Sequence, residues 1–229
     1  MAVQARAEAT RQTIIDAAVE LFGEVGYGNT GLNDIFARAQ VTKGAFYYHF
    51  PTKQSVAEAI FEQADSRFQE ALADLISSSP PALEYLVRLT FIVADVTEHD
   101  NLVRVGNLLR QGLLQVSPAA VATFDSRRRD ILVSLVKKAV AEGDLLDDID
   151  PDAVAHTIAT GLLGTRLLSD ATGEDMFARL TQVWDVILRG IASPESASAN
   201  RLCVIRAAEQ CRLNLPRFAA PPVLSATES

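Results

Sequence analysis

The chain has 229 residues, of which 48% are hydrophobic, 7% aromatic and 22% charged, and its formal net charge is −8. This composition allows a sizeable buried core, made mainly of Ala, Leu, Val and Ile because aromatic residues are few. It excludes a membrane-spanning protein, since no apolar run reaches the roughly 18–20 residues that a transmembrane helix needs.

The charge is unevenly distributed along the chain. Residues 1–54 contain five basic and five acidic residues, so residues 55–229 carry the whole net charge of −8. An acidic body repels the phosphates of a nucleic acid, and any contact with DNA is therefore expected only at the N-terminal end.

The first predicted helix covers residues 4–25. Ile14, Ala18, Leu21 and Phe22 follow helical spacing and form one apolar stripe. Gly26 is expected to end this helix, and Thr30 is expected to cap the next one.

Two short helices follow, over residues 31–38 and 43–50, with a turn at 39–41 between them. Thr42 is a suitable N-cap for the second helix, since its hydroxyl accepts a bond from a free backbone N–H. The spacing of Phe46 and Phe50 places both inward. The outward face then consists of Lys43, Gly44, Tyr47 and Tyr48. A short helix with this face suits a DNA major groove, where lysine neutralises a phosphate and glycine allows close approach.

The string V-T-K-G-A-F-Y-Y-H-F, the preceding G-Y-x-x-T and the lysine that follows P-T resemble the DNA-binding domain of TetR-family transcriptional regulators. The resemblance implies a helix-turn-helix domain over residues 1–52. It also implies two groups of DNA contacts. Thr30, Lys43, Tyr47, His49 and Lys53 are expected to bind mainly the DNA backbone, and Thr42, Gly44 and Tyr48 to lie nearest the base edges.

The rest of the chain predicts further helices and no strand, so the expected fold class is all-α. The helices are expected at about 53–77, 82–96, 102–116, 118–142, 151–171, 174–191 and 200–213. Thr52 is expected to cap the first of them. Residues 53–215 are interpreted as a ligand-binding and dimerisation domain, and residues 216–229 as a flexible tail.

The body is similar to the γ-butyrolactone receptor branch of the same family. The similarity lies in D-I-D-P-D-A-V-A-H-T, in G-T-R and in W-D-V-I-L-R-G, which begin at residues 148, 164 and 184. It implies that helices 151–171 and 174–191 pair with those of a second copy to form a homodimer. The residues expected at this dimer interface are Gly161, Gly164, Thr165, Leu168, Val183 and Ile187.

A small-molecule effector is expected to bind among the helices of the body, where an apolar ligand is best shielded from water. The candidate ligand-binding residues are Gln63, Tyr85, Arg88, Phe91, Leu109, Phe124, Arg128, Thr160, Leu163 and Trp184. Receptors of this branch usually carry a tryptophan near the position of Arg128. Three interpretations of its absence stay open: Phe124 substitutes for it, the ligand is more acidic, or the usual ligand is no longer bound.

Other kinds of site are not indicated. Asp147, Asp148, Asp150 and Asp152 lack the glycine and glutamate of a calcium loop, so they are interpreted as a helix cap with favourable dipole contacts. His99 and His156 have no further ligand at metal spacing and are interpreted as structural. No catalytic motif occurs, so neither an enzyme nor a cofactor is expected.

These observations together predict a homodimeric, ligand-responsive transcriptional repressor that binds a palindromic operator and is released by a γ-butyrolactone-like signal. Cys203 and Cys211 are expected to be free thiols in the reducing cytoplasm of a bacterium, where the protein would be associated with the nucleoid. The implied role is quorum sensing in the control of secondary metabolism. The alternatives are a TetR-type regulator of another lipophilic or acidic ligand and a ligand-blind pseudo-receptor.

Overall fold

The computed structural model describes residues 2–113 and 118–213, and within them it contains ten helices and no strand. A single isolated bridge joins Leu145 to Ala192. The prediction of an all-α fold is therefore confirmed. No helix in the described part of the chain combines the length and apolar content that crossing a bilayer requires.

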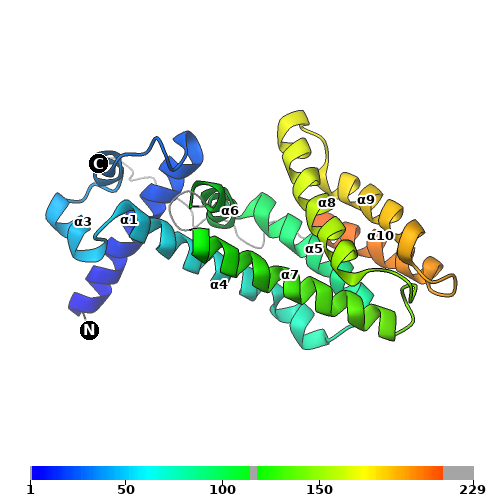
Figure 1. The fold of residues 1–229 in the computed structure, drawn as a ribbon. Helices are drawn as coiled ribbons and strands as arrows, with labels where there is room; N and C mark the ends of the chain where they lie inside the picture. Colours follow the sequence, from blue (N-terminus) through cyan, green and yellow to red (C-terminus); the bar gives the residue numbers. More distant parts are fainter. Residues whose placement is uncertain (1, 114–117, 214–229) are drawn as a thin grey trace.

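Three helices make up the N-terminal unit at one end of the molecule (Figure 1). They are α1 (Ala2–Val25), α2 (Leu32–Arg38) and α3 (Lys43–His49). Gly26 ends α1 with a φ of +82°, a backbone conformation that glycine adopts without a steric penalty. Thr42 caps α3 by accepting a 3.2 Å hydrogen bond from the backbone N–H of Ala45, as predicted.

The cap of α2 differs from the prediction. Gly31 is the N-cap residue, and its backbone N–H donates to the Asp34 carboxylate at 2.9 Å. The Thr30 hydroxyl turns away from the helix and donates to the Gly26 carbonyl at 2.9 Å. The prediction that Thr30 caps α2 is wrong, because its hydroxyl bonds back into the preceding turn.

α4 (Lys53–Ser78) starts at the N-terminal unit and runs into the body (Figure 1). Thr52 caps it with a 3.0 Å bond from the backbone N–H of Ser55, in agreement with the sequence. Val56 and Ile60, in its first two turns, are fully buried in the core of the N-terminal unit. The start of α4 is therefore packed as part of that unit.

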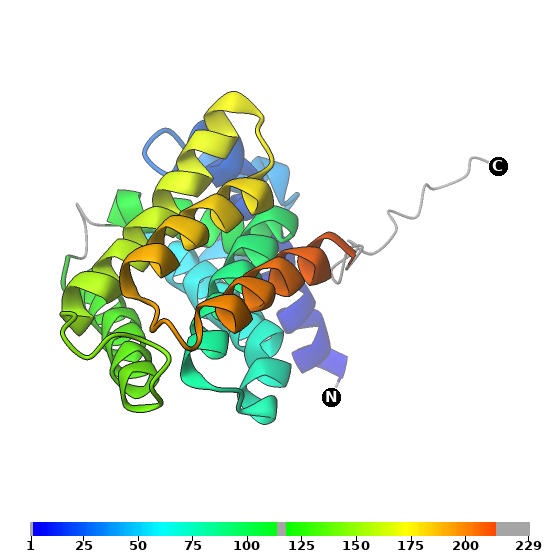
Figure 2. The ribbon, with the colours of Figure 1, turned by 90° about the vertical axis from the view of Figure 1, so that its right-hand side faces the viewer.

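The body is arranged around α5 (Ala82–His99), which contacts every other body helix. The remaining helices are α6 (Asn101–Leu113), α7 (Pro118–Ala141), α8 (Pro151–Thr172), α9 (Met176–Ile191) and α10 (Ala197–Leu213). Figure 2 shows α8 and α9 side by side, with α10 beside α9. These helices lie at the end of the body farthest from α3 (Figure 1).

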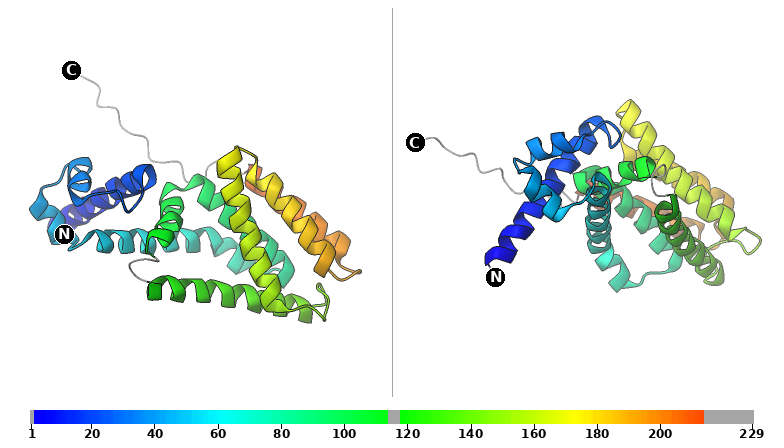
Figure 3. Two further views of the ribbon diagram at one scale, coloured as in Figure 1. Left: turned by 45° about the horizontal axis from the view of Figure 1, so that its top comes forward. Right: turned by 60° about the vertical axis from the view of Figure 1, so that its left-hand side comes forward.

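α6 belongs to both parts of the protein. Val105 and Leu109 are buried in the core formed by α1–α3 and the start of α4, whereas Val103 packs with Ala64 and Val96 in a separate cluster of the body. The position of α6 between the N-terminal unit and α7 is visible in Figure 3. α6 therefore contributes side chains to both cores.

Candidate nucleic-acid interface and effector cleft

The exposed face of α3 is formed by the residues that helical spacing predicts. Phe46 and Phe50 are 0% and 3% exposed and pack inward, and the Phe46 ring lies 4.7 Å from the Phe36 ring of α2. Burying each ring contributes roughly 1.5–3 kcal/mol, which is enough to hold a seven-residue helix in place. The opposite face is thereby left free for a partner.

The outward residues of α3 combine one cation with hydroxyl groups and little bulk. Tyr48 is 79% exposed and Tyr47 is 43% exposed, while Lys43 and Gly44 are also exposed. The ammonium of Lys43 lies 5.9 Å from the centre of the Tyr47 ring. Nothing lies within 4 Å of the point where a Cβ on Gly44 would sit, so this part of the helix is open to a close approach.

Two of the residues expected at the DNA backbone point inward. Thr30 is 2% exposed and its hydroxyl is bonded within the chain. The Lys53 ammonium donates to the carbonyl oxygens of Tyr27 and Thr30 at 2.8 and 2.9 Å. His49 is half-buried, with its ring 4.9 Å from that of Tyr48. The surface available to DNA is therefore narrower than the sequence suggested.

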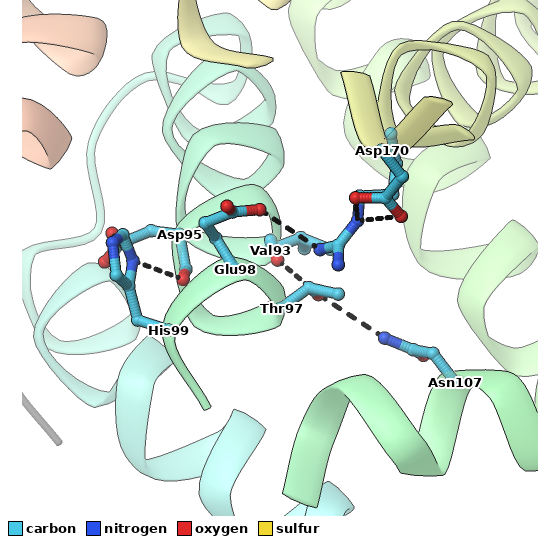
Figure 4. Close-up of polar contacts among 8 residues, drawn as sticks. Val93, Asp95, Thr97, Glu98, His99, Asn107 and Asp170 are labelled. Atoms are coloured by element: carbon cyan, nitrogen blue, oxygen red, sulfur yellow. Dashed lines mark hydrogen bonds and ion pairs between the residues drawn. The ribbon is translucent and has the colours of Figure 1, made fainter. Parts of the chain in front are cut away.

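A small cleft of about 30 Å³ lies between α4, α5, α6 and α7. Its walls are mainly apolar, and Arg128 of α7 stands over the Phe68 ring at 5.6 Å. Thr97 and Asn107 face each other across it at 3.4 Å, as Figure 4 shows. The lining residues are Phe61, Ala64, Asp65, Phe68, Val93, Thr97, Val103, Gly106, Asn107 and Arg128.

The predicted ligand-binding residues are not gathered in one cavity. Arg128 lines the cleft, and Tyr85 packs against the same buried cluster of Leu72, Leu75 and Leu89 as Phe68 does. The side chain of Phe124 lies outside the described residues. The sequence missed Phe61 and Phe68, although their separation of seven residues on α4 places them on one helical face.

The other ligand candidates have partners elsewhere. Gln63 is paired with Gln12 of α1, and Leu109 lies in the core beside α1. Arg88 is paired with Glu84 at 3.4 Å on its own helix.

Phe91 and Trp184 belong to the main core, where Trp184 donates from Nε1 to the Thr90 hydroxyl at 2.8 Å. Thr160 and Leu163 lie on the exposed face of α8. Helical spacing alone did not show which neighbour each face of a helix would meet, and the part of these seven positions in ligand binding stays a prediction.

The outer face of α8 and α9 carries large apolar side chains. Leu168 is 63% exposed and Val186 is 70% exposed, with Leu163 and Leu167 alongside at 44% and 53%. Several large apolar side chains exposed on the same two helices are typical of an interface between subunits.

The expected set of interface residues is only partly on this surface. Leu168 is on it, and Gly164 is open, with no atom near a built Cβ. Gly161 instead meets Val183 of the same chain, where a built Cβ would lie 2.9 Å from Val183 Cγ1. Thr165 is buried and Ile187 packs against the main core. Gly161, Thr165, Val183 and Ile187 all have contacts within the chain, and their part in a dimer interface stays a prediction.

Arg166 of α8 forms an ion pair with α5. Its guanidinium lies 3.6 Å from the Glu98 carboxylate and bonds both carboxylate oxygens of Asp170, at 3.0 and 2.9 Å (Figure 4). His99 lies with Nδ1 3.0 Å from the backbone carbonyl of Asp95, in keeping with a structural role. Of these contacts, the ion pair with Glu98 joins α8 to the helix that borders the cleft.

The remaining candidate sites have structural explanations. Asp150 caps α8 by accepting from the backbone N–H of Asp152 at 3.0 Å, as predicted. No group of three side chains able to hold a metal ion occurs among the described residues. A more open depression of about 300 Å³ lies between α9 and α10, and its Arg189 and Arg201 are both paired with Asp185. Cys203 and Cys211, both among the described residues, form no disulfide, and the Cys211 thiol donates to the Phe91 carbonyl at 3.6 Å.

Comparison with known proteins adds an independent line of observation. Residues 14–60 match the family described as "Bacterial regulatory proteins, tetR family", and residues 80–193 match "Tetracyclin repressor-like, C-terminal domain". The A-factor receptor protein of Streptomyces griseus is 30% identical over 197 residues, which cover 85% of this chain and 68% of that protein.

Two solved structures share the fold over most of the chain. A γ-butyrolactone receptor (ArpA-like protein) is 34% identical with a TM-score of 0.77, covering 90% of this chain and 99% of the other. CprB from Streptomyces coelicolor, in complex with its biological operator sequence, is 35% identical with a TM-score of 0.74 and the same coverage.

Proposed function

The chain belongs to the TetR family of bacterial transcriptional regulators, related to γ-butyrolactone receptors, and from that premise we propose that it is a homodimeric, effector-released repressor of a near-palindromic operator. TetR-family regulators are not enzymes, in agreement with the sequence. The observation that carries the proposal is the exposed face of α3, with Lys43 and two tyrosines on a helix small enough for a major groove.

The contacts proposed with DNA follow from that face. Lys43, Tyr47 and His49 bind the phosphate backbone, and Thr42, Gly44 and Tyr48 lie nearest the base edges. Half-sites about one helical turn apart are bound by the two copies of α3. The acidic body is kept away from the duplex by charge repulsion, which restricts contact to the N-terminal unit.

Dimerisation is proposed through the outer face of α8 and α9. Leu163, Leu167, Leu168 and Val186 form an apolar surface that a second copy covers by two-fold symmetry. The open position of Gly164 on this face allows the helix backbones to approach closely. A dimer also explains why such large side chains are exposed in the single chain.

The effector is proposed to enter the cleft between α4, α5, α6 and α7. The apolar walls and the Thr97–Asn107 pair suit a small lipophilic molecule with a carbonyl group, such as a γ-butyrolactone. Arg128 in the same wall favours a second candidate, a more acidic lipophilic ligand. Because about 30 Å³ holds little more than a water molecule, binding requires the surrounding helices to separate. We further propose that the protein acts in the cytoplasm, in signalling that controls secondary metabolism.

The operator is tested by fluorescence anisotropy with duplex DNA from upstream of the protein's own gene and a scrambled duplex, over a salt series. Selective binding is expected. Lys43→Ala should weaken binding and reduce the slope of log K against log salt by about 0.9 per subunit, since each lysine neutralises one phosphate. The control is Lys137→Ala, at an exposed position of α7. It removes the same charge and should leave the slope unchanged. Absence of binding at every salt concentration would refute the proposed function.

Dimerisation is tested by sedimentation velocity. Val186→Glu should yield monomers and weaken operator binding, because it places charge inside the proposed interface. Ile131→Glu, at a 55% exposed position of α7, is the matched control and should remain dimeric. A Val186→Glu protein that stays dimeric would place the interface elsewhere.

The effector is tested by adding lactones, butenolides and acidic lipids to the protein–operator complex. Release by a lactone or an acidic lipid that is lost in Phe68→Ala places the ligand in the cleft. A complex that none of these compounds releases favours the ligand-blind pseudo-receptor.

A further inference from the structure

We propose that Lys53 is a positioning residue that closes the helix-turn-helix unit and fixes the orientation of α3, without itself bonding a DNA phosphate. This inference rests on the proposed operator binding. It assigns a new role to a residue that the family resemblance places at the DNA backbone.

The geometry around the Lys53 ammonium carries the proposal. Its Nζ donates to the backbone carbonyl of Tyr27 at 2.8 Å and to that of Thr30 at 2.9 Å, and it lies 4.4 Å from the centre of the Tyr27 ring. Two of its three N–H donors are thus used, and an aromatic face covers the group. Burial lowers the pKa of Lys53, as expected for a cation partly withdrawn from water.

The two carbonyl groups belong to the turn that leads into α2. Thr30 is itself fixed by its hydroxyl bond to Gly26, and Asn29 donates from its amide to the Val25 carbonyl at 3.0 Å. α2 begins two residues later, at Leu32. Two bonds from Lys53 therefore hold the turn that leads into α2, just ahead of the Gly31 cap.

Lys53 itself begins α4, a few residues after the end of α3 at His49. Its ammonium consequently joins the segment that enters α2 to the segment that leaves α3, across 23 and 26 residues of sequence. The Phe36–Phe46 contact holds α2 and α3 together within this closed unit. Without the lysine, the start of α4 loses its bonds to the turn ahead of α2, although Arg38 of α2 still pairs with Glu20 and Glu24 of α1. α3 then gains freedom relative to α4.

A second polar contact, further along α4, also attaches this helix to the N-terminal unit. The Gln63 amide donates to Gln12 Oε1 of α1 at 2.8 Å, and the Gln12 amide donates back at 3.4 Å. Lys53 and Gln63 therefore attach α4 to the N-terminal unit at points ten residues apart. The unit and the first half of α4 are expected to move together when the effector binds.

Lys43 provides the contrast needed for a test. It is exposed on α3 and its ammonium faces the Tyr47 ring from 5.9 Å, in a position to reach a phosphate. The two lysines carry the same charge, so only their positions distinguish them.

The experiment measures operator affinity against salt for the full-length protein and three variants. Lys53→Met should raise Kd roughly tenfold or more at every salt concentration, with an unchanged salt slope, because two charge-assisted bonds are lost but no phosphate contact. Lys43→Met should reduce the slope by about 0.9 per subunit. Lys53→Arg keeps the charge but replaces a compact ammonium with a planar fork, so it should also weaken binding with an unchanged slope.

Two results would overturn the positioning role. One is a salt slope reduced by Lys53→Met as much as by Lys43→Met, and the other is wild-type affinity in Lys53→Arg, since arginine binds phosphate at least as well as lysine does. Circular dichroism at the assay temperature checks that each variant is folded. If Lys53→Met is unfolded, the affinity of Lys53→Arg alone tests the positioning role.

Hydrogen exchange without DNA separates this inference from the proposed function. Lys53→Met should speed amide exchange in residues 26–42 and leave that of α8 and α9 unchanged. Wild-type protein that binds no duplex refutes operator binding, while the exchange result still tests the closure by Lys53. Unchanged exchange in residues 26–42 would refute the closure.

Discussion

The buried hydrogen bond between Trp184 and Thr90 offers a quantitative test of the body core. The two side chains are 1% and 2% exposed, and the indole Nε1–H donates to the threonine hydroxyl at 2.8 Å. Trp184→Phe removes this bond, worth about 1 kcal/mol, and leaves about 40 Å³ unfilled, worth about another 1 kcal/mol. The expected loss of unfolding free energy is therefore about 2 kcal/mol.

Thr90→Val tests the other partner of the same bond. It leaves the indole N–H buried and unpaired, which costs about 1–3 kcal/mol. Combining the two substitutions removes both partners, so the double variant should be about 1–2 kcal/mol more stable than the sum of the single losses predicts.

The assay is urea unfolding followed by far-ultraviolet circular dichroism, since Trp184 is the only tryptophan and its replacement abolishes the fluorescence signal. Protein concentration is held constant because dimerisation contributes to apparent stability. Additive losses, within about 0.5 kcal/mol, would refute a stabilising bond. Effector release that disappears in Trp184→Phe while stability stays unchanged would restore Trp184 to the ligand site.

Three further outcomes are expected. Gly106→Ala should destabilise the protein by up to about 2 kcal/mol despite the better helix propensity of alanine, since its Cβ would lie 2.9 Å from the Cβ of Ala64. A melting temperature equal to or above that of the wild type would contradict this close packing. Asp150→Ala should cost about 1 kcal/mol in urea unfolding through loss of the α8 cap, whereas Asp150→Asn should cost less. Burial raises the pKa of Cys203 to about 11, so its alkylation at pH 8 should be slower than that of free cysteine and should accelerate as the pH approaches 11. Equal rates at pH 8 would mean that this thiol is not shielded.

The sequence was sufficient where the deciding contact lies within a few residues. Thr42, Thr52 and Asp150 cap their helices as predicted, because an N-cap bonds a backbone N–H only two or three residues ahead. The outward face of α3 was predictable for a related reason, since Phe46 and Phe50 are spaced one helical turn apart. The fold class and the family followed from such local patterns, taken together along the chain.

The tertiary structure decided what each face of a helix meets. Lys53 bonds carbonyl groups more than twenty residues away, and Trp184 bonds Thr90 at a separation of 94 residues. Gly161 and Gly164 are equivalent in the sequence pattern, but one meets Val183 of its own chain and the other is open. Helical periodicity specifies which residues share a face, whereas the neighbour of that face depends on how distant helices pack. The sequence alone therefore determined the helices and the family, and packing between distant segments determined the roles of Lys53, Gln63 and Trp184.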